Sequence, residues 1–207
     1  MSGTDRKVLL VTGGGSGIGA ATAVLAAERG WQVVVCGRRP ESLQAVAART
    51  GADVRVVDVT APDAVDDLVA SVVADFGRLD SVVANAGVMA VGSVVDTDPA
   101  DWDAVIGTNL TAVYRLARAA VPHLATEGGT FVGVSSIAAL RSSLAAAAYS
   151  TSKAGLIALV QSIARDFGGV GVRANVVCPG WIRTEMADAE MAEFGQAYAG
   201  SWLPGAA

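Results

Sequence analysis

A tyrosine and a lysine stand four residues apart in the segment Y-S-T-S-K, from Tyr149 to Lys153. On a helix, residues at this spacing project from one face about one turn apart, so the phenol and the ammonium would be neighbours. The positive charge would favour the phenolate, which makes the tyrosine a candidate acid or base for proton transfer. The same spacing is also common by chance on ordinary helix surfaces, so the pair needs support from the rest of the chain.

The segment T-G-G-G-S-G-I-G, from Thr12 to Gly19, predicts a turn on which a pyrophosphate can sit. It follows an apolar run typical of a buried strand, residues 8–11, and opens onto residues 20–29, which have the composition of a helix. Glycine permits the sharp bend and the close approach of backbone N–H groups to phosphate oxygens, and the helix N-terminus adds positive charge. The residues expected to contact a dinucleotide here are Gly13, Gly15, Ser16, Gly17, Ile18 and Gly19. A flexible glycine loop without a ligand is the alternative, because the spacing differs from G-x-G-x-x-G.

The elements that position these residues alternate between strand and helix, which predicts a doubly wound α/β fold with a parallel sheet. The expected strands run without polar alternation, so both faces of the sheet should be covered, and ligands should bind at the carboxyl ends of the strands. After the glycine turn, strands are expected at 33–36, 54–57, 82–84, 131–134 and 174–177, and helices at 40–50, 62–76, 101 to about 125, and 149–166.

Composition limits the classes of protein to consider. The 207 residues suit a single domain, and 52% of them are hydrophobic, yet no apolar run approaches the roughly 20 residues of a membrane span. A net charge of −5 argues against a nucleic-acid binder. Cys36 and Cys178 form no metal-ligand spacing and are expected to be reduced. No secretory signal pattern precedes the first strand, so we expect a cytoplasmic protein. We expect no metal, membrane or nucleic acid as a partner.

The end of the second expected strand carries two arginines, Arg38 and Arg39, and no carboxylate. In dinucleotide sites of this plan, an Asp or Glu about 20 residues past the glycines holds the ribose 2′-hydroxyl, whereas an Arg suits a 2′-phosphate. The pair therefore predicts NADP(H), with NAD(H) less favoured. The alternative is two solubilising arginines on an exposed loop.

Two further segments follow strands and could line the cofactor. Asp58, beside Val59, could accept from the adenine amino group, or could be an N-cap or loop carboxylate. Asn85, Ala86 and Gly87 could contact the cofactor or simply turn the chain. Neither segment is informative by itself.

Taken together, these motifs have a fixed order along one α/β chain. They are T-G-x-x-x-G-I-G at Thr12, N-A-G at Asn85, Asn109, Ser135-Ser136, Y-x-x-x-K at Tyr149 and C-P-G at Cys178. From about residue 7 to residue 186, the sequence resembles the short-chain dehydrogenase/reductase family. The resemblance implies a Rossmann-type sheet with strand order 3-2-1-4-5-6.

The resemblance also implies roles for individual residues. Tyr149 would be the acid in ketone reduction and the base in alcohol oxidation, with Lys153 lowering its pKa and holding the nicotinamide ribose. Ser136 would hydrogen-bond the substrate oxygen, and Asn109 would bend its helix and anchor a water that connects the lysine with solvent. The residues implied at the nicotinamide end are Pro179, Gly180, Ile182 and Thr184.

The chain departs from the family pattern after the sixth strand. Family members normally continue through a substrate-covering segment, another helix and a seventh strand, whereas this sequence has one helix-like stretch, 187–198, and ends at Ala207. We therefore expect a truncated C-terminal part without the seventh strand. The apolar helix that begins at Tyr149 needs a second cover, and the resemblance implies that this cover is the same helix of a second subunit. The resemblance also implies that a tetramer needs the final helix and strand, so we expect a homodimer that does not proceed to a tetramer.

Two functions fit the sequence. The favoured one is an NADP(H)-dependent oxidoreductase that acts on a small alcohol or carbonyl compound, supported by the intact Asn109, Ser136, Tyr149 and Lys153. The alternative is a nucleotide-binding sensor or partner subunit that has lost turnover, which the short C-terminus favours. The segments expected around the substrate, 89–96 and 140–144, do not identify it, because they are apolar and small without a diagnostic charge.

Overall fold

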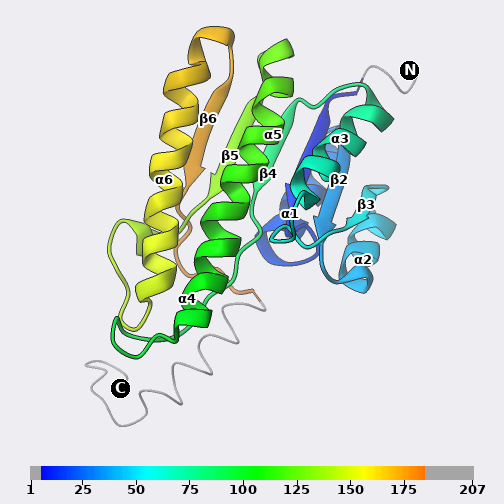
Figure 1. The fold of residues 1–207 in the computed structure, drawn as a ribbon. Helices are drawn as coiled ribbons and strands as arrows, with labels where there is room; N and C mark the ends of the chain where they lie inside the picture. Colours follow the sequence, from blue (N-terminus) through cyan, green and yellow to red (C-terminus); the bar gives the residue numbers. More distant parts are fainter. Residues whose placement is uncertain (1–5, 185–207) are drawn as a thin grey trace.

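The computed structural model describes residues 6–184, which form a six-stranded parallel sheet with helices on both faces (Figure 1). The order β3-β2-β1-β4-β5-β6 confirms the expected one. The strands are β1 (Val8–Thr12), β2 (Gln32–Gly37), β3 (Asp53–Val56), β4 (Ser81–Ala84), β5 (Thr130–Val134) and β6 (Arg173–Val177). The order reverses between β1 and β4, and a crevice opens at the carboxyl ends of the strands at such a reversal.

The two faces of the sheet are covered by different helices. Buried side chains of α1 and α2 pack on one face, and those of α3, α5 and α6 pack on the other. The helices are α1 (Gly17–Glu28), α2 (Pro40–Thr50), α3 (Ala64–Phe76), α4 (Pro99–Ile106), α5 (Ala112–Glu127) and α6 (Ala147–Phe167). Between residues 6 and 184 there are also three short segments, the π-helical η1 (Gly107–Thr111) and the 3₁₀ turns η2 (Ile137–Ala139) and η3 (Gly168–Val170).

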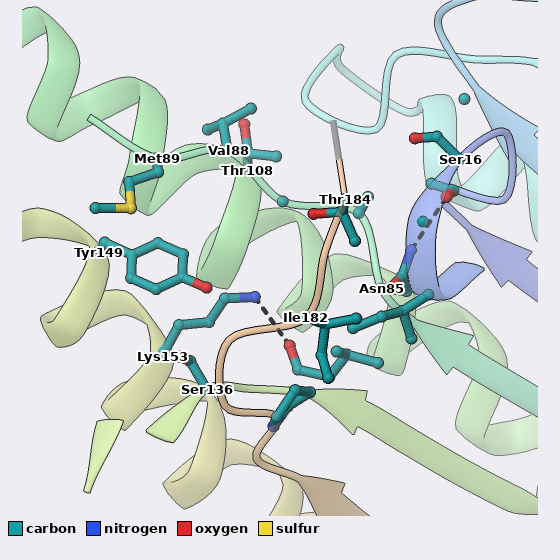
Figure 2. A pocket seen from close by; sticks show the side chains of 18 of the residues that line it. Ser16, Asn85, Val88, Met89, Thr108, Ser136, Tyr149, Lys153, Ile182 and Thr184 are labelled. Carbon is teal, nitrogen blue, oxygen red and sulfur yellow. Dashed lines mark hydrogen bonds between the residues drawn. The ribbon is translucent and has the colours of Figure 1, made fainter. Parts of the chain in front are cut away.

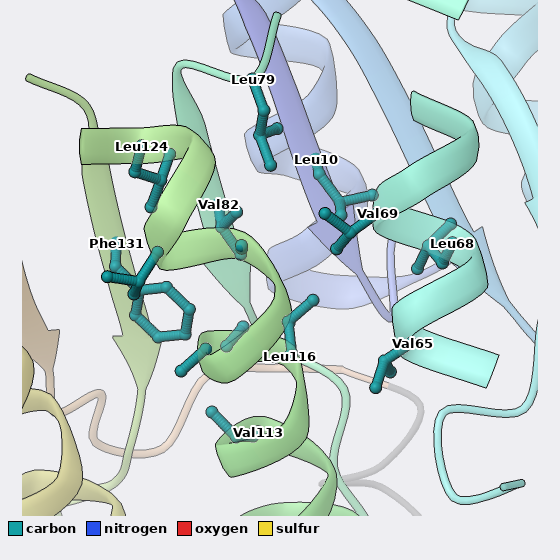
Figure 3. Close-up of a cluster of buried hydrophobic side chains, with 14 of the residues drawn as sticks. Leu10, Val65, Leu68, Val69, Leu79, Val82, Val113, Leu116, Leu124 and Phe131 are labelled. Atoms are coloured by element: carbon teal, nitrogen blue, oxygen red, sulfur yellow. The ribbon is translucent and has the colours of Figure 1, made fainter. Parts of the chain in front are cut away.

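Strand β1 shows why the apolar runs lack alternation. Leu10 belongs to the cluster under α3 and α5 (Figure 3), whereas Leu9 and Val11 belong to the cluster under α1 and α2. All five residues of β1 are buried. A strand that is covered on both faces needs an apolar side chain at every position, as the sequence predicted.

Four predicted helix starts differ from the structure by two or three residues. Helix α1 begins at Gly17 and not at residue 20, and α6 begins at Ala147 and not at residue 149. Helix α3 begins at Ala64 and not at residue 62, because Asp63 takes a left-handed conformation with φ of 58°. The helix expected from residue 101 begins at Pro99, where Pro is preorganised for the first turn and the Asp98 carboxylate accepts from the N–H of Ala100 at 2.8 Å.

The expectations for the C-terminal part, including the helix-like stretch 187–198 and the missing seventh strand, lie outside the described residues. None of the helices between residues 6 and 184 has the length and apolarity needed to cross a bilayer. Within the same residues, the His, Cys, Asp and Glu side chains form no group of three or more that could hold a metal ion.

Candidate active site

A cavity of about 520 Å³ lies along the carboxyl ends of the strands and connects the glycine turn with the Tyr149 end of α6. Gly19 and Asn109, two of the predicted site residues, lie behind its wall and do not line it. The predicted residues that line it are Gly13, Gly15, Ser16, Gly17, Ile18, Arg38, Arg39, Asp58, Val59, Asn85, Ala86, Gly87, Ser136, Tyr149, Lys153, Pro179, Gly180, Ile182 and Thr184.

The glycine turn is packed too tightly for side chains. A Cβ at Gly19 would lie 2.3 Å from the carbonyl oxygen of Gly13, and Gly13 itself has a φ of +63°. The segment after β6 reaches the same turn, since a Cβ at Gly17 would lie 3.0 Å from the Thr184 methyl carbon. Helix α1 begins at Gly17, so its N-terminal N–H groups open onto the cavity, as a phosphate site requires. The turn therefore fits a dinucleotide pyrophosphate.

Thr12 and Asn85 join the glycine turn to the end of β4. The Thr12 hydroxyl accepts from the backbone N–H groups of Asn85 and Ala86, at 3.0 and 3.1 Å. The Asn85 amide donates to the carbonyl oxygens of Thr12 and Gly13, at 3.0 and 3.1 Å. Asn85 therefore lines the cavity and also fixes its shape. Thr12 was not among the predicted site residues, although it opens the T-G-x-x-x-G-I-G motif at the end of a buried strand.

The β2 and β3 end of the cavity holds two arginines and a carboxylate. Arg38 and Arg39 are exposed at its edge, and the Arg39 guanidinium donates to the Ser16 hydroxyl at 3.2 Å. The Asp58 carboxylate accepts from the N–H and the hydroxyl of Thr60, at 2.9 and 2.7 Å. These hydrogen bonds, with a smaller effect of the Arg38 charge, lower the pKa of Asp58. Asp58 thus bonds within its own loop, as the alternative of a loop carboxylate predicts.

At the other end of the cavity, Tyr149 and Lys153 project from the first two turns of α6 (Figure 2). The Lys153 Nζ lies 5.6 Å from the centre of the Tyr149 ring, and it donates to the carbonyl oxygen of Val134 at 2.9 Å. The lysine is only 4% exposed, and this burial lowers its pKa from 10.5 to about 8. The helix thus places the phenol and the ammonium side by side, as their spacing predicted.

Asn109 lies in η1, the π-helical turn between α4 and α5, and is fully buried. Its amide oxygen accepts from the N–H of Val88 at 2.8 Å, and its amide nitrogen donates to the carbonyl of Val88 at 2.9 Å and to the Ser152 hydroxyl at 3.0 Å. The Ser152 hydroxyl in turn donates to the carbonyl of Tyr149 at 2.7 Å. Asn109 therefore connects the segment after β4 to the tyrosine turn.

Ser152 is a second residue that the sequence analysis missed. It is fully buried, and its hydroxyl bridges Asn109 to the Tyr149 backbone. The only signal for Ser152 in the sequence was its place directly before Lys153. A serine in a helix is not by itself informative, since Ser162 of the same helix only donates to the carbonyl of Ala158.

Ser136 begins the segment that follows β5, and it is half-buried at the cavity wall. Its hydroxyl oxygen accepts from the N–H of Ala138 at 3.1 Å. The next N–H, of Ile137, donates to the carbonyl of Pro179 at 2.9 Å, so the segments after β5 and β6 are tied together. Its neighbour Ser135 faces inward and donates to the carbonyl of Lys153 at 2.8 Å.

The family model described as short chain dehydrogenase matches residues 7–193. The chain belongs to the short-chain dehydrogenase/reductase family. Among its relatives is the 3-oxoacyl-[acyl-carrier-protein] reductase FabG of Thermotoga maritima, which is 35% identical over 190 residues, covering 89% of this chain and 77% of the reductase.

Solved structures of family members superpose on nearly the whole chain. A variant of actinorhodin polyketide ketoreductase, solved with NADPH, has a TM-score of 0.89 and 32% identity, with 99% of this chain and 80% of that chain covered. An NAD⁺-bound xylitol dehydrogenase has a TM-score of 0.87 and 34% identity, with 94% and 77% covered. Short-chain dehydrogenases/reductases are oxidoreductases of alcohol and carbonyl groups that bind NAD(P)(H), and these two structures hold one cofactor of each kind.

Proposed function

We propose that the protein is an NADP(H)-dependent oxidoreductase that interconverts a small alcohol and the corresponding carbonyl compound, with Tyr149 as the general acid and base. One observation carries the proposal: Tyr149, Lys153 and Ser136 open onto the same cavity as the glycine turn. The bound nicotinamide would supply or accept the hydride. The protein would then have to transfer one proton and to stabilise the negative charge on the substrate oxygen.

In the reductive direction, negative charge develops on the carbonyl oxygen and needs donors already in position. The Tyr149 hydroxyl would donate its proton to that oxygen. The Ser136 oxygen accepts from the N–H of Ala138, which leaves its own O–H to donate a second hydrogen bond to the substrate oxygen. In oxidation, the tyrosinate would take the proton from the alcohol.

Lys153 would hold both the tyrosine and the cofactor ribose. An ammonium has three donors, and one of them is directed to the carbonyl of Val134. The others can serve ribose hydroxyls, while the charge beside the Tyr149 ring stabilises a phenolate. The Asn109 and Ser152 bridge keeps the turn that carries both residues in place.

The preference for NADP(H) rests on Arg38 and Arg39, which provide two guanidiniums at the β2 edge of the cavity. A charge-assisted bond to a 2′-phosphate contributes roughly 1.5 to 3 kcal/mol, so NADPH should bind about 10 to 100 times more tightly than NADH. Titration of both cofactors into wild type and Arg38→Ala, followed by nicotinamide fluorescence, tests this preference. Equal affinities in the wild type would remove the NADP(H) assignment and leave the oxidoreductase proposal standing.

We also propose a homodimer formed through α6 and α5. Two small residues of α6, Ala154 and Ala158, are exposed, and Tyr114 on α5 is half exposed. Such a flat face suits the close approach of a second copy in a two-fold arrangement. Sedimentation equilibrium of the 207-residue chain should give a dimer, and a monodisperse monomer or a stable tetramer would count against it. The two free cysteines, Cys36 and Cys178, agree with the cytoplasmic location that we propose.

A screen of ketones and aldehydes with NADPH, monitored by loss of cofactor absorbance, tests the activity itself. Turnover of at least one carbonyl compound is expected, and the same compound should not be turned over by Tyr149→Phe. If NADPH binds and no carbonyl compound is reduced, the alternative of a nucleotide-binding protein without turnover replaces this proposal.

A further inference from the structure

The cavity is divided by charge. Among the described residues, five ionisable side chains line the cavity. Arg38, Arg39 and Asp58 lie at the β2 and β3 end, and Tyr149 and Lys153 lie at the other end. Beyond Tyr149, the wall is made by side chains without charge. These are Met89, Ile137, Ala138, Ala146 and Trp181, with Ser143 as a small polar member.

The apolar character continues onto the surface around this end. Trp181 is 70% exposed and Leu140 69%, and Leu144 and Ile137 are exposed as well. Exposed apolar side chains at the edge of a cavity are typical of a ligand site, because they are otherwise left in contact with water. Figure 2 shows Met89 beside the Tyr149 ring, on the side away from Lys153, so an apolar side chain also borders the ring of the catalytic candidate.

Within residues 6–184, no lysine or arginine other than Lys153 lines this end of the cavity. Arg141 and Arg183 belong to the same two segments of the chain, but neither lines the cavity. The Lys153 ammonium is buried and donates to the carbonyl of Val134. A carboxylate or phosphate placed against Ile137 and Trp181 would lose its hydration without gaining a partner, which is strongly unfavourable.

We propose that the substrate is an uncharged carbonyl compound or secondary alcohol with an apolar body, and that carboxylates and phosphate esters are rejected. This inference rests on the proposed function, since it assigns the substrate class of the same site. The apolar body would lie against Ile137 and Trp181, with the reacting oxygen at Tyr149 and Ser136. Rejection of anions follows from the lack of a cationic partner on this wall among residues 6–184.

Two ketones of nearly equal shape test the class: methyl 4-acetylbenzoate, which is neutral, and 4-acetylbenzoate, which carries a carboxylate. We expect kcat/KM with NADPH to be roughly 100-fold higher for the ester, because the buried carboxylate lacks a partner. Calorimetry of the enzyme with saturating NADP⁺ gives the dissociation constants of both compounds, and the ester should bind more tightly than the acid.

The two measurements separate this proposal from the previous one. If neither ketone is reduced but the ester binds more tightly than the acid, the substrate class stands and the proposed turnover fails. Equal affinities, tighter binding of the acid, or no binding of the ester would overturn the substrate class, whatever the turnover.

Two arginine substitutions test the position of the substrate, one on the cavity wall and a matched control outside the cavity. Ser143 lines the cavity, whereas its exposed neighbour Ser142 does not. Ser143→Arg should tighten the binding of 4-acetylbenzoate about 10-fold by pairing with its carboxylate, with the ester changed less than about twofold. Ser142→Arg adds the same charge outside the cavity and should change neither. A similar gain in both variants would contradict the proposed position of the substrate.

Discussion

The two ends of the cavity are built by different means. At the glycine end, the shape comes from backbone without side chains, and the charged residues, Arg38 and Arg39, stand on exposed loops. At the tyrosine end, Asn109, Ser152 and Lys153 are buried. The Asn109 amide donates to the Ser152 hydroxyl, and the Lys153 ammonium donates to a backbone carbonyl of β5. Exposed charges can be exchanged at little cost to the fold, whereas a buried hydrogen-bonded group cannot. Cofactor preference should therefore be easy to change by mutation, and catalysis should be inseparable from the stability of the core.

Tyr149→Phe should have the largest effect, and it should be confined to the tyrosine end. Loss of general acid–base catalysis lowers kcat by roughly 10²- to 10⁴-fold, while the dissociation constant of NADPH should stay within about twofold. Steady-state kinetics and a cofactor titration measure both. Tyr114→Phe, which removes the same hydroxyl from a tyrosine outside the cavity, is the control and should keep the wild-type kcat and NADPH affinity. A kcat for Tyr149→Phe within a few-fold of wild type would break the assignment of the acid.

Lys153 should make the stability of the protein depend on pH. Its pKa is about 8 in the folded protein and 10.5 when unperturbed, so between these values the unfolded chain binds more protons. The free energy of unfolding should therefore rise with pH across this window, by up to about 3 kcal/mol from this group. Below pH 8 the lysine is charged in both states, so the full cost of burying its charge lowers the stability of the folded protein.

Urea unfolding of wild type and Lys153→Met between about pH 7 and pH 10.5 measures this contribution. The other titrating groups are common to both proteins, so the difference between the two curves isolates the lysine. The wild type should gain about 3 kcal/mol relative to the variant as the pH rises. Parallel curves would show that the burial of Lys153 leaves its protonation unchanged.

Gly19→Ala should damage the glycine end alone. The new Cβ would lie 2.3 Å from the carbonyl oxygen of Gly13, so the turn must shift, at a cost of about 1 to 3 kcal/mol. NADPH should bind roughly 10 to 100 times more weakly. Gly168→Ala is the matched control, because a Cβ there meets no neighbouring atom within 4 Å. Unchanged cofactor affinity in Gly19→Ala would show that the close packing of the turn does not position the phosphate site.

Ser152→Ala should have the smallest effect. It removes one hydrogen bond from the Asn109 amide and one from the Tyr149 carbonyl, which together correspond to about 1 to 3 kcal/mol. We expect kcat to fall about 10-fold with little change in the affinity for NADPH. Ser162→Ala on the exposed face of α6 serves as the control. If both variants keep full kcat, Ser152 only fills space and does not position the tyrosine.

The sequence predicted the layout of the fold because its signals are local. Helix α2 begins at Pro40 and ends at Thr50 as expected, since proline and glycine punctuate its two ends. The strands lie within one residue of their predicted bounds, because apolar residues dominate each of them, even where Arg55 in β3 and Asn175 in β6 interrupt the run. Helix α3 was placed too early, because nothing near residue 62 indicates the left-handed conformation of Asp63.

The parts of the site that the sequence did not predict depend on contacts between distant segments. The bond from the Asn109 amide to Ser152 joins residues 43 apart, and the bond from the Asn85 N–H to the Thr12 hydroxyl joins residues 73 apart. Spacing along one helix could bring Tyr149 and Lys153 together, but it could not indicate which buried serine holds them. The uncharged wall beyond Tyr149 also became visible only once the segments after β4, β5 and β6 had been brought to one edge of the sheet.

The most direct test of the central claim follows the hydride itself. NADPH that carries deuterium at the transferable C4 position is incubated with the enzyme and a neutral aryl ketone, and the product alcohol is examined by mass spectrometry and proton NMR. We predict one deuterium on the carbinol carbon with wild type, and no product above background with Tyr149→Phe. Product without deuterium, or equal product from both proteins, would contradict the proposed hydride transfer and its acid.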